Sequence, residues 1–199
     1  MCRNMSFWCN KEKMKSDILI VGVGGQGIIL TSDIISKAAL KDGFNVKKAE
    51  THGMAQRGGS VITHVRISNS DIYSPLIPKG KVDVLIGFEP MEALRYMGYI
   101  NRKNKNSIMI VNRNPIEIEN YPDINEIISE IKRHRNSIIL NALELANKAG
   151  NVLTQNIVML GAASRYLPID RDTLKETIKG NVKRAINENL KAFELGSQI

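Results

Sequence analysis

Asp17–Leu30 reads DILIVGVGGQGIIL, and this stretch decides the fold. Its first part, Ile18–Val21, is a continuous apolar and largely β-branched run, which is typical of a strand buried on both faces of a sheet. A glycine-rich turn follows, and residues 28–40 then place their apolar side chains at helical spacing. We therefore expect a buried strand, a tight turn and a helix, in that order.

The rest of the chain continues this alternation. Further strands are expected at 44–49, 60–68, 82–88, 107–111 and 137–140. Helices are expected from 89, at 124–132, 141–150 and 156–167, and as one long final helix capped by Thr173 and Glu176. The half-polar face of the strand at 60–68 indicates an antiparallel or peripheral strand. The pattern predicts an α/β fold: a single three-layer domain over 16–199, with a Rossmann-like, mostly parallel sheet and helices on both faces.

Residues 1–15 fall outside this pattern and are expected to be a disordered leader. No apolar run approaches the roughly 18 residues that span a bilayer. The opening segment also lacks the continuous apolar stretch of a secretory signal, so we expect a cytoplasmic protein with no membrane partner. Cys2 and Cys9 are the only cysteines. Two thiols make neither a disulfide scaffold nor an iron–sulfur site, and we expect no metal in this chain.

The net charge is +8, from 28 basic and 20 acidic side chains. Outside the leader the basic residues form scattered clusters at Lys79/Lys81, Arg102–Lys105 and Lys132–Arg135. No aromatic residues alternate with them, as they would in a platform on which bases stack. A solvated basic surface is therefore favoured, and binding of nucleic acid ranks last among the functions weighed.

The glycine turn has the spacing G-x-G-x-x-G and comprises Gly22, Gly24, Gly25, Gln26 and Gly27. Glycines allow a close backbone approach, and the helix that follows offers unpaired N–H groups, so the turn suits a phosphate. Glu50, near the end of the second strand, could bind a ribose hydroxyl. The same turn also serves close packing of strand on helix, or close approach of a partner chain, and the spacing does not choose among these.

A second motif joins the second expected strand to the third. It consists of Glu50, Thr51, His52, Gly53, Gln56, Arg57, Gly58 and Gly59. Its glycines expose the backbone around an amide and a guanidinium, which suits a carboxylate, a phosphate or a partner's backbone. Arg57 is the best candidate to bind an anion, and His52 is expected to line an interface or site. His64, on the polar face of its strand, is expected at the surface or an interface.

Five blocks together resemble a known family: GVGGQGIILTSDII (22–35), AETHGMAQRGGSVITHVRI (49–67), YSPLIP (73–78), VDVLIGFEPMEALRY (82–96) and NIVMLGA (156–162). They are similar to the gamma-type subunit of 2-oxoacid:ferredoxin oxidoreductases, and most nearly to its indolepyruvate type, the subunit called beta there. The resemblance runs from Asp17 to the C-terminal helix and leaves residues 1–15 outside.

The resemblance implies an oxidoreductase subunit of anaerobic amino-acid catabolism. The enzyme would decarboxylate an indolepyruvate or aryl-pyruvate substrate, reduce ferredoxin and form an acyl-CoA and CO2. Thiamine diphosphate, Mg2+ and [4Fe-4S] clusters would be held by a large partner subunit, with coenzyme A as co-substrate. This chain would bind no cofactor alone and be inactive alone. No residue is assigned a catalytic role, and both motifs would lie at the shared surface or line the active site.

Two alternatives stay open. One is a gamma subunit of the pyruvate or 2-ketoisovalerate type. The other is a free-standing protein that binds NAD or another nucleotide, supported by the glycine turn together with Glu50 and weakened by the absence of room for a separate substrate domain.

Overall fold

The computed structural model describes residues 14–52, 58–116 and 120–199. It is built on one six-stranded sheet with the strand order β2-β3-β1-β4-β5-β6. The strands are β1 (Lys15–Val23), β2 (Asn45–His52), β3 (Ser60–Ser68), β4 (Val84–Gly87), β5 (Ile108–Asn112) and β6 (Ser137–Leu140). β1 thus begins at Lys15, the last residue of the expected leader. Residues 1–13 of that leader lie outside the described ranges.

Five strands of the sheet run in the same direction, and β3 runs in the opposite one. β1, β4, β5 and β6 pair in parallel, as expected of alternating strands and helices. β3 pairs antiparallel with β1 on one side and with β2 on the other. The antiparallel direction predicted for 60–68 is confirmed, but the strand is not peripheral: it is paired along both edges, and β2 forms the edge of the sheet.

This order splits the expected strand–helix–strand unit at the start of the fold. In a simple crossover β2 would lie beside β1. Here β3 lies between them, so that Ile20 pairs with Thr63 and Thr63 pairs with Glu50. Neighbouring strands are about 4.8 Å apart, which places the backbone of Glu50 about 10 Å from β1.

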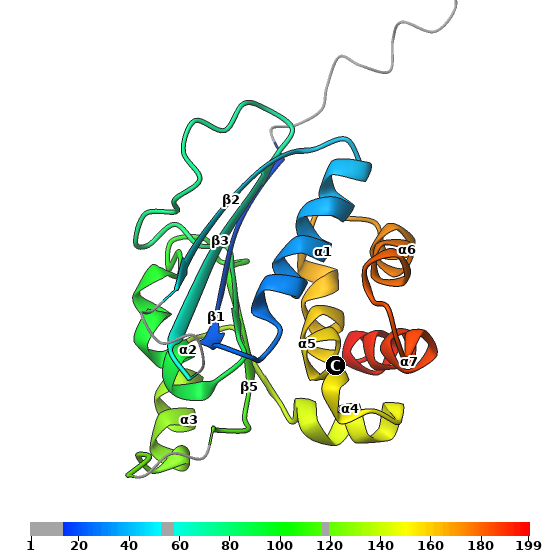
Figure 1. The fold of residues 1–199 in the computed structure, drawn as a ribbon. Coiled ribbons are helices and arrows are strands. Elements are labelled where there is room, and N and C mark those ends of the chain that lie inside the picture. Colours follow the sequence, from blue (N-terminus) through cyan, green and yellow to red (C-terminus); the bar gives the residue numbers. More distant parts are fainter. Residues whose placement is uncertain (1–13, 53–57, 117–119) are drawn as a thin grey trace, which may run out of the picture.

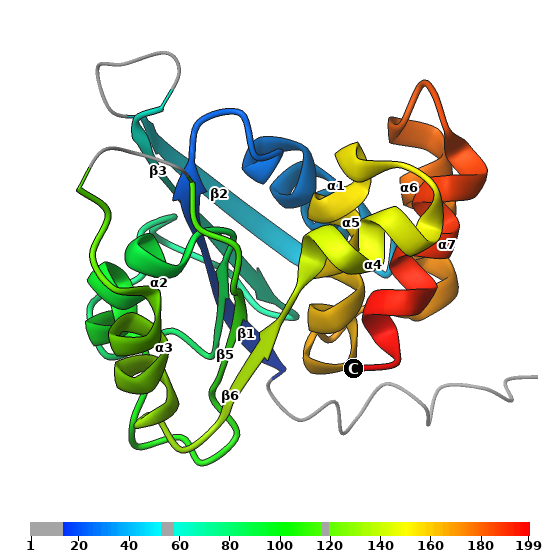
Figure 2. The same ribbon diagram turned by 90° about the horizontal axis from the view of Figure 1, so that it is seen from below.

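The helices cover both faces of the sheet, in three layers (Figures 1 and 2). On one face lie α1 (Ile28–Lys41), α4 (Ala142–Ala149), α5 (Gln155–Ala163), α6 (Arg171–Asn181) and α7 (Ile186–Ser197). On the other lie α2 (Pro90–Tyr96) and α3 (Ile124–Lys132). Short 3-10 turns follow α2 (97–99) and flank α5 (152–154 and 164–166). No helix in the described ranges is long and apolar enough to cross a membrane.

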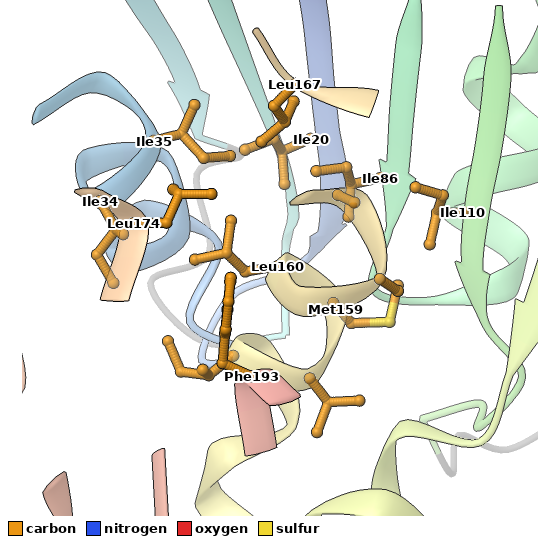
Figure 3. Packing of buried hydrophobic residues seen from close by; sticks show 14 of the residues in the cluster. Ile20, Ile34, Ile35, Ile86, Ile110, Met159, Leu160, Leu167, Leu174 and Phe193 are labelled. Carbon is orange, nitrogen blue, oxygen red and sulfur yellow. The ribbon is translucent and has the colours of Figure 1, made fainter. Parts of the chain in front are cut away.

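Each face of the sheet has its own hydrophobic core. Alternate residues of β1 divide between the two: Ile18 and Ile20 face α1 and α5, whereas Leu19 and Val21 face α2 and α3. The larger core is shown in Figure 3, where Leu160 of α5 lies between Phe193 of α7 and the sheet residues Ile20 and Ile86. Burial on both faces explains the unbroken apolar run of β1.

Helices α5 and α7 cross at two glycines. A Cβ added at Gly161 would lie 2.2 Å from the carbonyl oxygen of Phe193, and one added at Gly196 would lie 2.1 Å from that of Val158. Both distances are far below van der Waals contact with backbone, so this crossing requires glycine on both helices.

The apolar stripe predicts one long final helix, but the chain forms two separate helices, α6 and α7, so that prediction is wrong. α6 is capped by Asp170, whose carboxylate accepts hydrogen bonds from the N–H groups of Asp172 and Thr173, and it ends at Asn181. α7 begins after Ala185, which has φ 53 and lies in the left-handed region. The break has a packing reason: α6 lies against α1, whereas α7 lies against α4 and α5. A straight helix would not reach both.

His64 is buried, not at the surface, so the expectation for this residue is wrong. It is 5% exposed, and its Nδ1 accepts a hydrogen bond of 3.2 Å from the N–H of Ile77. Two residues on, Arg66 forms an ion pair with Asp17, which is fully buried on β1. The polar face of β3 is covered by the connection from β3 to β4, a cover that periodicity along one strand does not reveal.

Replacing Gly161 by alanine is expected to destabilise the protein. The added methyl group forces α5 and α7 apart, at a cost of about 1–3 kcal/mol or more. Gly180→Ala in α6 is the matched control, because nothing lies within 4 Å of its Cβ position. Alanine there should be neutral or stabilise by up to about 1 kcal/mol. Urea denaturation distinguishes the two, and equal midpoints would contradict the tight crossing.

The stability should fall at mildly acid pH because of His64. Burial lowers the pKa of its imidazole below the ordinary 6.5, and the charge of Arg66 adds to the shift. The unfolded chain then binds the proton first, so the contribution of His64 is complete above pH 6.5 and is lost as the pH falls below it.

His64→Asn keeps an acceptor near the position of Nδ1 but does not titrate. Its free energy of unfolding should therefore depend less on pH than that of the wild type between about pH 7.5 and about pH 5.5. Identical pH slopes in the two proteins would contradict this role of His64.

Candidate functional site

The candidate site lies where the parallel strands end. β1 leads into α1 on one face of the sheet, whereas the neighbouring β4 leads into α2 on the other face (Figure 1). In open α/β sheets, ligands bind outside the carboxyl ends of the strands at such a switch point. The glycine turn, 22–27, is located there, as the sequence predicts.

The structure brings the two predicted motifs into contact. The N–H of Gly24 donates a hydrogen bond of 2.9 Å to the carbonyl oxygen of Gly59. This contact follows from the pairing of β1 with β3, because Val23 and Ser60 face each other at the end of the ladder. The end of the second motif therefore lies directly on the first, and together they form one edge of the molecule.

Gln26 holds the turn in place. Its Oε1 accepts a hydrogen bond of 2.8 Å from the N–H of Val23, and its Nε2 donates one of 3.2 Å to the carbonyl oxygen of Phe88 at the end of β4. Asn112, at the end of β5, also donates to Phe88. The amide of Gln26 is thus used inside the fold, and it ties together the ends of β1 and β4.

The glycines of the turn have different roles. A Cβ at Gly22 would lie 2.6 Å from Oε1 of Gln26, and one at Gly27, which has φ 83, would lie 2.8 Å from Nδ2 of Asn156. These two glycines allow close packing. Gly25 has φ 101 and nothing within 4 Å of its Cβ position, and it is exposed. It is the glycine beside which a ligand or a partner chain has room.

One hollow of about 190 Å³ opens beside the turn on the α5 side. Gly25, Gln26 and Asn156 line it together with Val152 and Leu153 of the 3-10 turn before α5. Leu153 is 82% exposed, although it is a large apolar residue. The hollow is therefore bordered by exposed backbone on one side and by apolar side chains on the other.

A second hollow, of about 250 Å³, lies on the α2 side and contains acidic residues that sequence reasoning missed. Glu89 accepts hydrogen bonds from the N–H of Glu92, at 2.9 Å, and from the hydroxyl of Tyr121. Glu92 accepts one from the hydroxyl of Ser60 and pairs with Arg95 at 2.8 Å. Both residues are buried, Glu89 with 2% and Glu92 with 5% of its surface exposed. Burial and the bond to Glu89 raise the pKa of Tyr121, so its phenol stays a donor.

The sequence feature that could have indicated this acidic cluster is the N-terminal cap of α2. Glu89-Pro90-x-Glu92 starts a helix, with proline in its first turn and a carboxylate bonded to the helix N–H. Ser60 and Tyr121 also donate hydrogen bonds to these carboxylates. These bonds form because three separate segments of the chain come together, and no local sequence pattern predicts such a contact. Ser60 connects the end of the second motif directly to α2.

The other residues of the second motif are placed as follows. Glu50 and Thr51 lie within β2, and Glu50 forms an ion pair of 2.6 Å with Lys48, away from the turn. His52 ends β2, its backbone paired with Val61. Gly58 is exposed, with φ 80, and Gly59 contacts the turn. The side chain of His52, and Gly53, Gln56 and Arg57, lie outside the described residues.

The expected dinucleotide geometry is not found. In that geometry Glu50 would end a parallel strand directly beside β1, whereas the antiparallel β3 occupies this place and Glu50 lies one strand further out. Within the described ranges, no group of three or more His, Cys, Asp or Glu side chains is placed to hold a metal ion.

Comparison with known proteins shows what this chain is similar to. A family model described as pyruvate ferredoxin/flavodoxin oxidoreductase matches residues 17–199. The indolepyruvate oxidoreductase subunit IorB of Archaeoglobus fulgidus is 44% identical over 194 residues, which are 92% of this chain and 94% of that one. The subunit of the same name from Pyrococcus horikoshii is 40% identical over 192 residues, 90% and 93% of the two chains.

Solved structures share the fold. The gamma subunit of a keto/oxoacid ferredoxin oxidoreductase from Geobacter sulfurreducens superposes with a TM-score of 0.70 at 22% identity, covering 92% of this chain and 96% of that one. A 2-oxoglutarate:ferredoxin oxidoreductase from Magnetococcus marinus matches with the same TM-score and identity. The match covers 94% of this chain but 31% of that longer chain. The predicted fold class and the family resemblance are confirmed.

Replacing Gln26 by leucine should loosen the turn. The N–H of Val23 loses its acceptor and the tie to β4 is broken, which should lower the free energy of unfolding by about 1–3 kcal/mol. Gln155→Leu is the matched control, because Gln155 lines the same hollow but bonds only to Val152 of its own turn. It should change stability by less than about 0.5 kcal/mol. Hydrogen exchange at Val23 should rise in the first variant only, and equal exchange in both would contradict the proposed tie.

Proposed function

Because the chain belongs to the pyruvate ferredoxin/flavodoxin oxidoreductase family, we propose that it is the small subunit of an indolepyruvate:ferredoxin oxidoreductase. The observation that carries this proposal is the identity of 44% with a subunit of that name, over nearly the full length of both chains. The enzyme would oxidatively decarboxylate an aryl-pyruvate to an acyl-CoA and CO2 in the cytoplasm, with ferredoxin as acceptor.

In this proposal the chain acts only with a larger subunit. That subunit would hold thiamine diphosphate with Mg2+, which supplies the carbanion chemistry, and the [4Fe-4S] clusters that pass electrons to ferredoxin. The names of the relatives support an enzyme made of several chains, since each relative is called a subunit. Alone, the chain would have no turnover.

The role of this chain would be to shape the active-site cleft from the carboxyl edge of the sheet. Gln26 keeps the turn rigid, Gly25 leaves room beside the backbone, and Ser60 fixes the end of the second motif on α2. A surface whose parts are already held in place loses little conformational entropy when a partner or substrate binds. Arg57, carried by the same motif, would bind an anion, either a phosphate of coenzyme A or a substrate carboxylate.

Two observations bear on the alternatives. Relatives at 23–30% identity are subunits of 2-oxoglutarate synthase, so the same family includes subunits of enzymes for other 2-oxoacids. They are less similar to the chain than the indolepyruvate subunits, which favours the aryl-pyruvate type. A free-standing NAD-binding protein is disfavoured by the position of β3 and by the ion pair of Glu50 with Lys48.

Co-expression with the large subunit tests the proposal. We expect a stable complex that reduces ferredoxin when given indolepyruvate and coenzyme A, while neither chain does so alone. Pyruvate and 2-oxoglutarate serve as controls for the substrate class. Turnover by the isolated small chain, or failure of the two chains to associate, would contradict it.

The same assay tests the second motif through Arg57→Ala. We expect assembly to persist and turnover to fall by about tenfold or more, with the loss in KM if the arginine binds coenzyme A or substrate. Arg135→Ala, at the opposite end of the strands, is the matched control and should change neither. Unchanged assembly and turnover in Arg57→Ala would contradict the anion-binding role.

A further inference from the structure

The connection between β3 and β4 presents a rigid segment that the proposed function does not use. It includes Tyr73-Ser74-Pro75-Leu76-Ile77-Pro78 and lies on the α2 side of the sheet, teal to green in Figure 1. Ile77 is 2% exposed and belongs to the smaller core. The two prolines restrict the backbone, so the segment is extended and stiff.

A buried ion pair holds this segment against β3. Arg66 donates to Asp17 at 2.8 Å and, through the other arm of its guanidinium, to the carbonyl oxygens of Ser74 at 3.0 Å and Leu76 at 3.3 Å. Asp17 also pairs with Lys15 at 2.6 Å. With the bond from Ile77 to His64, the backbone of the segment is fixed at three residues, 74, 76 and 77.

The fixed backbone displays two large apolar side chains to solvent. Tyr73 is 90% exposed and Leu76 is 55% exposed. Tyr73 stands between two hollows, of about 430 and 340 Å³, that share Asp71, Ile72 and Tyr73 as lining residues. The first hollow continues onto the edge strand β2 and the end of α1, where Leu40 is 57% exposed. The result is a continuous, partly apolar surface.

This surface is far from the glycine turn. Lys15, at the start of β1, lines one of the hollows, whereas the turn follows Val23 at the other end of the strand. Nine residues in a strand extend about 26 Å. A contact made at Tyr73 would therefore be separate from the active-site edge.

A tyrosine held on a rigid segment between two hollows is typical of a binding hot spot. The rim is basic: Lys15 and Lys47 line the hollows, and Lys79 and Lys81 follow Pro78. Among the described residues that line the two hollows, Asp71 is the only acidic one apart from the buried Asp17. Two copies of this chain packed symmetrically would bring the lysines of one rim near those of the other, which is unfavourable.

From these observations we propose that Tyr73, the two hollows beside it and the exposed Leu76 of the same segment form a second docking surface for the larger subunit, which would meet it with an apolar pocket rimmed by carboxylates. The proposal rests on the proposed function.

The test is the affinity of the purified small chain for the purified large subunit, measured by biolayer interferometry. Tyr73→Ala combined with Leu76→Ala should weaken binding by about tenfold or more. Both side chains are exposed, so the thermal unfolding of the variant should match that of the wild type. Ile186→Ala, which removes an apolar side chain that is 41% exposed on α7, is the matched control and should leave the affinity unchanged.

Each other outcome overturns the inference. Unchanged affinity of the double variant shows that this surface does not dock, and equal losses in the double variant and in Ile186→Ala show that exposed apolar residues in general cause the effect. Concentration-dependent dimers of the small chain alone, abolished by the double variant, identify the partner as a second copy. If the wild type does not bind the large subunit, the proposed function fails, whereas the other results leave it standing.

Discussion

The pairing of β3 with β1 is the constraint on which the rest of this structure depends. The two strands are antiparallel over their full length, from Lys15 opposite Ser68 to Val23 opposite Ser60. One end of this ladder places Gly59 on the glycine turn, and the other places Arg66 beside Asp17. Because β3 occupies the place beside β1, β2 and its Glu50 are displaced to the edge of the sheet.

The two ends of the ladder produce two kinds of surface. At the carboxyl end of β1, hydrogen bonds from Gln26 and the Ser60–Glu92 contact make a rigid edge with exposed backbone at Gly25. At the other end, a buried charge pair fixes a proline-containing segment. A buried ion pair is weak evidence for stability on its own, because desolvation offsets much of the attraction. Its geometry here, with one guanidinium bonded to Asp17 and to two backbone carbonyls, does account for a fixed conformation.

Glycine in this protein serves packing as much as ligand access. Gly22 and Gly27 bring β1 and α1 close to Phe88 and Asn156, and the crossing of α5 with α7 needs Gly161 and Gly196. A glycine-rich turn after a strand is therefore a weak sign of nucleotide binding unless the neighbouring parallel strand also supplies a residue that binds the nucleotide. Here β3, the antiparallel neighbour of β1, brings the second motif to the turn instead.

The sequence by itself determined the α/β class, β1 with its turn and α1, the helix at 124–132 and the strand at 137–140, because these depend on local periodicity, caps and glycine. The combination of the two motifs also predicted the family. Only the tertiary structure decided the position of β3, the burial of His64, the break at Ala185 and the joining of Ser60 and Tyr121 to the carboxylates of α2. Each of these depends on contacts between segments distant in the chain, and local propensity carries no information about which distant segment covers a given face.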